Sequence, residues 1–325
     1  MVLQMKLYKL LNFLLLAFFC LFCQAQTYPN KPIKLIVGFA PGGAADYVAR
    51  NISVPLGQAL GQTIIIENKP GAGSSIAAES VAKSSPDGYT ILIASPSSIS
   101  VNPALNAKLA YRPSDLLPIS KVTSSPVVIA VNPNTGIFSV KDLIAKAKQD
   151  PGGLNYGTSG NGSAPHLAAA LFSQIADIKM THIPFRGGSL SIQSVVAGDT
   201  QLTFGTPPSV LPMIQSGRLR GLGISQKERS QLAPNLPGMK EAGLPEYEIE
   251  FWYGLFAPAG TPPVILQKLF EATQIALRQP NVKVALAREG TDVSLSASPA
   301  DFSKFLVEDE KFWVKLVKSA DVKVD

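Results

Sequence analysis

Six loops rich in glycine, serine, threonine and asparagine hold the residues of this chain that are best suited to bind a small molecule. Each loop follows a short apolar run, and most precede a helical pattern, so their N–H and O–H groups should gather where strands end. Neutral donors and helix N-termini suit a carboxylate that must later be released. Ordinary turns have a similar composition, and that alternative applies most strongly to the second loop. The loops span residues 40–43, 68–74, 95–98, 157–163, 186–189 and 205–209.

The first loop, at 40–43, joins an apolar run at 33–39 to a helical pattern with apolar residues three and four positions apart. Its glycines permit a tight turn and leave the helix N-terminus bare, which favours an anion. The loop has neither the lysine of a P-loop nor the GxGxxG pattern of a dinucleotide site. Asp46 follows in the first helical turn, four residues before Arg50, and this spacing favours a structural ion pair.

Five further side chains near these loops have both a binding and a structural interpretation. His166 near a helix start is equally suited to contact a ligand or to pack and cap. His182 falls within a strand pattern, where a structural role is favoured. Arg186 could meet a second acidic group of a ligand or lie solvated at a rim. Phe39 and Phe204 end apolar runs and could enclose a flat or aliphatic body, the alternative being ordinary core packing.

Catalytic and metal-binding patterns are scarce in this sequence. It has no GxSxG elbow and no HExxH, and its two histidines are not spaced as metal ligands. Both cysteines, Cys20 and Cys23, lie in an N-terminal apolar segment, so the rest of the chain has no thiolate chemistry. We therefore predict a binding protein with no catalytic residues, no metal and no cofactor. A pair formed by Ser159 and His166 leaves a secreted serine hydrolase as an alternative.

Composition and the N-terminus indicate an exported, well-folded protein. The 325 residues are 46% hydrophobic and 16% charged, which is typical of a globular protein long enough for two domains. Lys6 and Lys9 precede an apolar segment at 10–23 and a small residue at Ala25, so residues 1–25 are a predicted secretory signal peptide. The formal net charge of +6 comes without a run of basic residues, which argues against a nucleic-acid partner.

Short apolar runs alternate with helical patterns from Tyr28 onward, which predicts an α/β fold with mainly parallel sheets. Nine strands are many for one small sheet, so we expect two sheets in two lobes around a cleft. Lobe 1 should comprise residues 26–125 plus 251–325, and lobe 2 residues 126–250. The predicted strands are at 33–39, 63–67, 89–94, 127–131, 154–157, 180–185, 201–204, 219–224 and 253–257.

Two serine–aspartate pairs have the spacing of helix starts. Ser139 with Asp142 should cap a helix over 140–149, and Ser298 with Asp301 should open the last helix of the chain. The apolar stripe along that last helix predicts packing on the core rather than a partner site.

Six motifs follow one another along the chain. They are Phe39-Ala40-Pro41-Gly42-Gly43 with Asp46, Asn68 with Gly71-Ala72-Gly73, Pro86-Asp87-Gly88-Tyr89-Thr90, Gly157-Thr158-Ser159-Gly160 with Gly162 and His166-Leu167, His182-Ile183-Pro184-Phe185-Arg186-Gly187-Gly188, and Ala257-Pro258-Ala259-Gly260-Thr261-Pro262. Together they resemble the Bug-type extracytoplasmic solute receptors, the substrate-binding components of tripartite tricarboxylate transporters. The resemblance runs from about Tyr28 to the C-terminus.

The resemblance implies a two-lobed periplasmic binding protein of the type II-like Venus-flytrap kind, each lobe a mainly parallel sheet flanked by helices. It implies capture of a small organic carboxylate in the interlobe cleft, with no chemistry done on it. The implied partners are the large and small membrane subunits of a tripartite tricarboxylate-type transporter, and we expect a monomer. Some members of the family serve signalling, so a ligand sensor for a membrane partner is a further alternative.

In this family, loops matching 39–43 and 158–163 hold one ligand carboxylate, and regions matching 95–98, His166 and 204–209 shape the rest of the pocket. Many relatives carry an aspartate after the phenylalanine matching Phe204, where this chain has Gly205 and Thr206. Without that aspartate an amino-acid ammonium has no partner, which favours a di- or monocarboxylate with an aliphatic or aromatic body. The predicted ligand-binding residues are Phe39, Ala40, Pro41, Gly42, Gly43, Ser95, Ser97, Ser98, Thr158, Ser159, Gly160, Asn161, Gly162, His166, Arg186, Phe204, Gly205 and Thr206.

Overall fold

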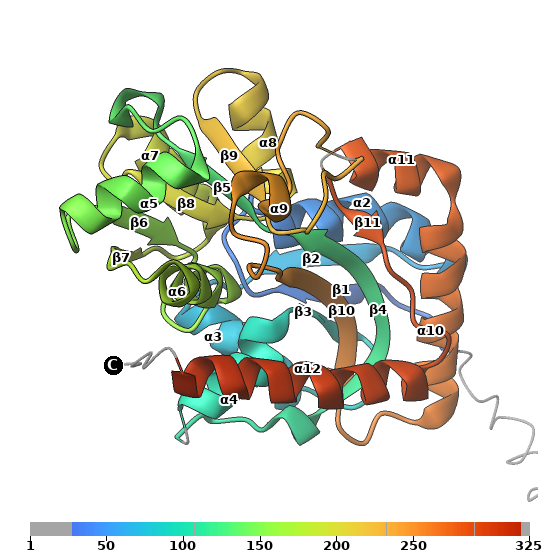
Figure 1. Ribbon diagram of the computed structural model, residues 1–325. Helices are drawn as coiled ribbons and strands as arrows, with labels where there is room; N and C mark the ends of the chain where they lie inside the picture. The colour runs from blue at the N-terminus through green and yellow to red at the C-terminus, as the bar shows by residue number, and fades with distance from the viewer. Residues whose placement is uncertain (1–27, 107, 232, 289, 320–325) are drawn as a thin grey trace, which may run out of the picture.

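Two β-sheets flanked by helices form the framework of the protein in the computed structural model, which describes residues 28–106, 108–231, 233–288 and 290–319 (Figure 1). This is the α/β architecture with two sheets that the alternating pattern predicts. The predicted signal peptide at 1–25 lies outside the described residues. Within those residues, no helix combines the length and the apolar character needed to cross a bilayer.

The first sheet has six strands in the order β11-β4-β10-β3-β1-β2. Its strands are β1 (Ile33–Val37), β2 (Ile64–Asn68), β3 (Thr90–Ala94), β4 (Leu116–Pro126), β10 (Glu250–Pro258) and β11 (Asp292–Val293). The helices of this half are α2 (Ala44–Leu60), α3 (Ser75–Ala82), α4 (Asn102–Leu105), α10 (Pro263–Arg278), α11 (Pro280–Arg288) and α12 (Pro299–Ser319). Shorter helical turns are η1 (Ala72–Ser74), η2 (Ser97–Val101) and η3 (Pro113–Asp115).

The second sheet has five strands in the order β7-β6-β8-β5-β9. Its strands are β5 (Val128–Val131), β6 (Asn155–Thr158), β7 (Thr181–Pro184), β8 (Leu202–Gly205) and β9 (Arg220–Ile224). The helical segments of this half are η4 (Pro133–Thr135), α5 (Val140–Gln149), α6 (Ala164–Ala176), α7 (Gly188–Ala197), α8 (Pro207–Gln215) and α9 (Met239–Ala242).

Strand directions are mixed in both sheets, which corrects the expectation of mainly parallel sheets. Strand β1 is parallel to β2 and β3, but β10 is antiparallel to both β3 and β4. Likewise, β6 is parallel to β7 and β8, whereas β5 is antiparallel to β8 and β9. The antiparallel pairings involve β4, β5 and β10, because these strands carry the chain out of one sheet and back from the other instead of belonging to βαβ units.

The chain passes between the sheets at two places. Strand β4 ends at Pro126 and β5 begins at Val128, so the first passage is almost direct. The second passage runs through residues 225–249, between β9 and β10. From these passages we propose that residues 26–125 plus 251–325 and residues 126–250 act as two lobes that move about the paired strands β4 and β10.

Helix α12 contacts the cores of both sheets. Phe302 near its start packs edge-on against Trp252 in the core of the first sheet, whereas Trp313 stacks on Phe251 in the core of the second. Between them, the Asp309 carboxylate accepts hydrogen bonds from the indole Nε1 of Trp252 and of Trp313 at 2.8 and 3.0 Å. Helix α12 therefore links the two sheets in addition to the chain passages, and Figure 1 shows it lying across the molecule.

Candidate ligand-binding site

A cavity lies between the two sheets and is lined by both. The first half contributes the loop after β1, the start of α2, the loop after β3 and part of β10. The second half contributes the ends of β6 and β8 and the first turns of α6, α7 and α8. The lining residues are Phe39, Gly43, Ala44, Ala45, Ser95, Ser97, Thr158, Ser159, Pro165, Gly188, Ser191, Ile192, Thr203, Phe204, Gly205, Thr206, Ser209, Phe251 and Tyr253.

Half of the predicted ligand-binding residues line this cavity, namely Phe39, Gly43, Ser95, Ser97, Thr158, Ser159, Phe204, Gly205 and Thr206. The others do not line it, namely Ala40, Pro41, Gly42, Ser98, Gly160, Asn161, Gly162, His166 and Arg186. Most of these nine belong to the same loops as the lining residues. Arg186 is exposed, as the solvated-rim alternative describes. Five of the six predicted loops thus meet at one cavity, and the loop at 68–74 does not reach it.

The cavity wall offers neutral hydrogen-bond donors. The Ser95 hydroxyl is buried, with 5% of the residue exposed, and has no hydrogen-bond partner among the described residues. The Tyr253 hydroxyl, with an ordinary pKa of 10 that burial raises further, is neutral at neutral pH. No lining residue is an aspartate, glutamate, lysine, arginine or histidine. A buried hydroxyl without a partner costs free energy, so the wall is suited to an oxygen-bearing ligand.

The start of α2 forms part of the same wall. Gly42 has a φ of 79°, a left-handed conformation that favours glycine, and it turns the chain into the helix. Gly43 is the N-cap and supplies no side-chain hydrogen bond, so the first N–H groups of α2 are uncapped. Gly43, Ala44 and Ala45 all line the cavity. The positive end of the helix dipole therefore faces the cavity.

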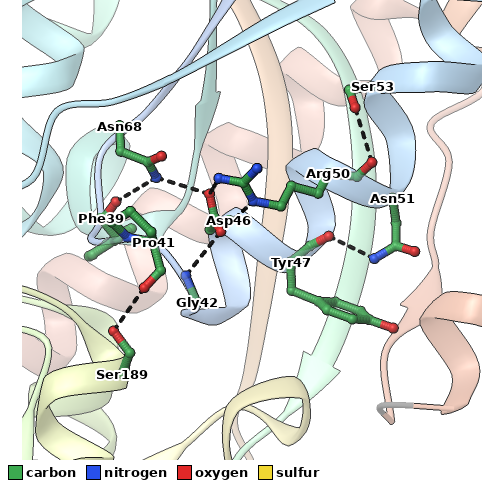
Figure 2. Close-up of polar contacts among 10 residues, drawn as sticks. All are labelled: Phe39, Pro41, Gly42, Asp46, Tyr47, Arg50, Asn51, Ser53, Asn68 and Ser189. Atoms are coloured by element: carbon green, nitrogen blue, oxygen red, sulfur yellow. Dashed lines mark hydrogen bonds and ion pairs between the residues drawn. The ribbon is translucent and has the colours of Figure 1, made fainter.

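The Asp46 carboxylate anchors the loop at 40–43 through hydrogen bonds, as Figure 2 shows. It accepts the Gly42 N–H at 2.9 Å, and Arg50 donates to its two oxygens from Nε and Nη2 at 2.7 and 3.0 Å. Asn68 Nδ2 donates to Asp46 Oδ1 at 3.1 Å and to the Phe39 carbonyl oxygen at 3.0 Å. The expected ion pair between Asp46 and Arg50 is confirmed, and it belongs to a network that fixes the first loop.

Asp46 is ionised without adding net charge to the cavity. Burial alone would raise the pKa of its carboxyl, but hydrogen bonds from Arg50, Gly42 and Asn68 outweigh burial and hold the pKa below its ordinary value of 3.8. The adjacent Arg50 guanidinium balances the negative charge. The electrostatics at the start of α2 therefore depend mainly on the backbone N–H groups.

The two halves touch next to the cavity. Ser189 Oγ, in the first turn of α7, donates to the Pro41 carbonyl oxygen at 3.2 Å (Figure 2). A Cβ atom added to Gly187 would lie 3.0 Å from both the Cβ and the N atom of Ala40. The described conformation is therefore one in which backbones from the two halves pack against each other beside the cavity.

The two histidines of the chain support the loop at 158–163. The imidazole rings of His166 and His182 stack with centroids 3.7 Å apart and planes inclined by 10°. The Gly162 N–H donates to His166 Nδ1 at 3.3 Å, and Thr158 Oγ1 lies 2.5 Å from His182 Nε2. Burial lowers the pKa of His166 to about 4, and burial together with His166 lowers the pKa of His182 to about 3. Both rings are therefore neutral at neutral pH.

This arrangement does not form a nucleophile–base pair from Ser159 and His166. The His166 Nδ1 atom already accepts the Gly162 N–H, and the face of its ring is covered by His182. No hydrogen bond joins the described side chains of Ser159 and His166. Across the described part of the chain, no group of three histidine, cysteine, aspartate or glutamate residues could hold a metal ion.

Several lining residues were not predicted from the sequence. Phe251 and Tyr253 reach the cavity from β10, two positions apart on one face of the strand. Gly188, Ser191 and Ile192 lie three and four positions apart on one face of α7. These spacings were a signal in the sequence, but they point to a cavity only once both elements are placed beside it.

Comparison with known proteins identifies the family. The profile of the tripartite tricarboxylate transporter family receptors matches residues 48–322. The chain is 34% identical to the protein BugT of Bordetella pertussis over 302 residues, which cover 92% of each chain.

Solved structures give the same result. MatC from Rhodopseudomonas palustris, solved with bound malate, is 30% identical with a TM-score of 0.84, over 89% of this chain and 100% of that chain. An R. palustris protein solved with adipate is 31% identical with a TM-score of 0.88, over 91% of this chain and 99% of that one. These matches confirm the resemblance seen in the sequence motifs. The chain belongs to the receptor family of the tripartite tricarboxylate transporters and has the two-lobed fold of its solute-binding proteins.

Proposed function

We propose that this receptor captures a small organic carboxylate in the cavity between its two lobes. The observation that carries the proposal is the wall where the uncapped N-terminus of α2 and the unpartnered Ser95 hydroxyl meet in one cavity. A carboxylate would accept hydrogen bonds from both and would be favoured by the helix dipole. Since no cationic side chain lines the cavity, the ligand would be held without a permanent ion pair and could be released.

The body of the ligand is expected to be aliphatic or aromatic. Phe39, Ile192, Phe204, Phe251 and Tyr253 supply apolar surface on the cavity wall. An amino acid is disfavoured because its ammonium group would meet no carboxylate among the lining residues. The malate and adipate of the two R. palustris structures are dicarboxylates with short aliphatic bodies, which supports the same ligand class here.

We further propose that the protein is exported through residues 1–25 and acts in the periplasm as a monomer. It would deliver its ligand to the large and small membrane subunits of a tripartite tricarboxylate-type transporter, or signal occupancy to a membrane partner. We expect no reaction on the ligand, because the geometry around Ser159 and His166 does not favour the alternative of a serine hydrolase.

A thermal-shift screen of the exported protein, stripped of ligand by unfolding and refolding, tests this function. The panel would contain malate, succinate, adipate, citrate, benzoate and glutamate. A ligand at 100 times its dissociation constant should add about 2.7 kcal/mol to the free energy of unfolding and raise the melting temperature clearly. Chromatography after long incubation should return the acid unaltered. No shift with any acid, or a shift with glutamate alone, would oppose the proposal, and hydrolysis of added esters that Ser159→Ala abolishes would favour the alternative.

A further inference from the structure

The loop at 68–74 is the one predicted loop that does not line the cavity, and its backbone is strained. Gly71, Ala72, Gly73 and Ser74 follow one another with φ values of 133°, 46°, 56° and 77°. Ala72 and Ser74 are two of the three described non-glycine residues with a positive φ. The Ser74 hydroxyl is also buried without a hydrogen-bond partner among the described residues. Strain of this kind persists only where surrounding contacts enforce it, and it concentrates at functional sites.

The side chain of Asn102, at the start of α4, enforces the strained conformation. Asn102 is buried, with 5% of the residue exposed. Its Nδ2 atom donates to the carbonyl oxygens of Ala72 and Gly73 at 3.1 and 3.0 Å and to Ser75 Oγ at 2.7 Å. The two hydrogens of one amide group are thus shared among three acceptors of the loop and the first residue of α3. One buried side chain of the first half therefore anchors the whole strained segment.

The anchored loop packs against the second half of the molecule. A Cβ atom added to Gly73 would lie 3.1 Å from the carbonyl oxygen of Asn161. A Cβ atom added to Gly162 would lie 2.5 Å from Asn102 Oδ1. The strained loop and its anchor therefore both approach the loop at 157–163 so closely that glycine leaves the room they need.

This contact between the halves is separate from the one beside the start of α2, where Ser189 Oγ donates to the Pro41 carbonyl oxygen. The loop at 157–163 contributes Thr158 and Ser159 to the cavity wall, whereas the loop at 68–74 contributes no lining residue. The contact thus connects the first half to part of the cavity wall without itself facing the cavity.

We propose that Asn102 is a positioning residue for ligand binding, which holds residues 71–74 in the conformation that the second half meets when the halves close on a ligand. Because Asn102 and this segment belong to the same half, the segment is ordered before closure. Without the anchor the segment would have to be ordered at each closure, and that entropy cost would appear in the dissociation constant. This inference rests on the proposed binding function and assigns a role to a residue outside the cavity.

The test compares Asn102→Ala with Asn132→Ala in the exported protein. Asn132 is also buried, with 6% exposed, and its Nδ2 atom donates to the carbonyl oxygens of Val195 and Val196 at 2.8 and 3.4 Å, all within the second half. Both variants should lower the melting temperature, because each leaves buried carbonyl groups without a donor. Isothermal titration with the acid of the screening panel that binds the unsubstituted protein most tightly should show about tenfold weaker binding for Asn102→Ala, the cost of ordering roughly one backbone residue. Asn132→Ala should bind the acid as the unsubstituted protein does.

Hydrogen exchange in the unsubstituted protein supplies a second measurement, which holds even if Asn102→Ala does not fold. Because residues 71–74 lie outside the cavity, slower exchange of their amide hydrogens with ligand reports the meeting of the halves rather than contact with the ligand. We expect the same acid to slow exchange at 71–74 as well as at 157–163. Slower exchange at 157–163 alone would overturn the inference.

The outcomes separate this inference from the proposed function. If the unsubstituted protein binds none of the acids, the proposed function fails. If it binds an acid and Asn102→Ala binds it equally well, the anchor plays no part in binding and the inference is overturned. Equal loss of affinity in Asn102→Ala and Asn132→Ala would also overturn it, because reduced stability would then account for both.

Discussion

At the scale of single residues, the Ser95 hydroxyl is expected to contribute to ligand affinity and not to the stability of the fold. It is buried on the cavity wall and has no partner among the described residues. Ser100, in contrast, donates a hydrogen bond to Asp309 Oδ2 at 3.0 Å and does not line the cavity. Replacing either buried serine by alanine removes the same hydroxyl group. We expect the loss at Ser95 to lower ligand affinity and the loss at Ser100 to lower stability.

We predict that Ser95→Ala weakens carboxylate binding by about tenfold to a hundredfold, the loss of one hydrogen bond to a charged acceptor. The free energy of unfolding without ligand should stay level or rise, since an unpaired buried hydroxyl is removed. Ser100→Ala should lower stability by about 1 kcal/mol and leave affinity unchanged. Calorimetric titration with urea unfolding on the same samples measures both quantities, and loss of stability without loss of affinity in Ser95→Ala would contradict the assignment.

At the scale of elements, the stacked histidines join α6 to β7 beneath the loop at 158–163. Their ordinary pKa is 6.5, whereas in the folded protein burial lowers the pKa of His166 to about 4 and that of His182 to about 3. At pH above 6.5 both states of the protein hold neutral imidazoles. As the pH falls below that value the unfolded chain takes up protons first, so stability is lost as the pH drops toward the folded values.

The expected pH dependence is a decrease in the free energy of unfolding between pH 6.5 and about 4, of up to about 1.4 kcal/mol per pH unit for His166. His182 is partly exposed and should contribute less. Asn at position 166 can still accept the Gly162 N–H but cannot titrate. Urea unfolding at several pH values should give a shallower slope for His166→Asn and a still shallower one for His166→Asn with His182→Asn. Equal slopes in all three proteins would refute this explanation.

The sequence predicts some elements of this fold directly and others not at all. Nine strands were found from their apolar runs, and the starts of α5 and α12 from Ser139 and Ser298, because local patterns determine both. Strand β4 was missed because Pro118, Lys121 and three serines interrupt its pattern, and the strand is defined by its pairing with β10. The mixed strand directions likewise depend on long-range pairing, which no local pattern encodes.

The lining of the candidate binding site was likewise predictable from the sequence in part. Loops that follow strands gather at one edge of a sheet, so Gly43, Ser95, Ser159 and Thr206 could be predicted from their positions after apolar runs. Tyr253 could not, because its place on the wall depends on β10 crossing next to the cavity. The position of His166 behind its loop depends on the packing of α6 against β7, which spacing alone does not reveal.

At the scale of the whole molecule, the contact between the halves should control affinity. Gly187 has a φ of 151° and packs against Ala40, so an added Cβ atom would collide at 3.0 Å when the halves meet. Gly217 also has a positive φ, 72°, but a Cβ atom there would meet nothing within 4 Å. Gly217→Ala therefore reports backbone strain without a contact between the halves, whereas Gly187→Ala combines that contact with strain in a more restricted conformation, φ 151° and ψ 161°.

We predict that Gly187→Ala weakens ligand binding by at least tenfold. The added Cβ atom should lower the population of the closed conformation, which is the one that binds the ligand. Gly217→Ala should reduce stability through backbone strain without changing the dissociation constant. Small-angle scattering with and without ligand should show compaction in the unsubstituted protein and in Gly217→Ala, and less compaction in Gly187→Ala. Unchanged affinity in Gly187→Ala would mean that this contact plays no part in closure.

The central claim is that a neutral cavity between two lobes binds a carboxylate through helix N–H groups and hydroxyls. It is tested most directly by isothermal titration of the ligand-free protein with the acid that binds best and with its primary amide. The amide keeps the shape of the ligand and loses its charge. The account predicts clear binding of the acid, and binding of the amide at least a hundredfold weaker. Equal binding of acid and amide, or binding of neither by protein shown to be folded and free of ligand, would contradict it.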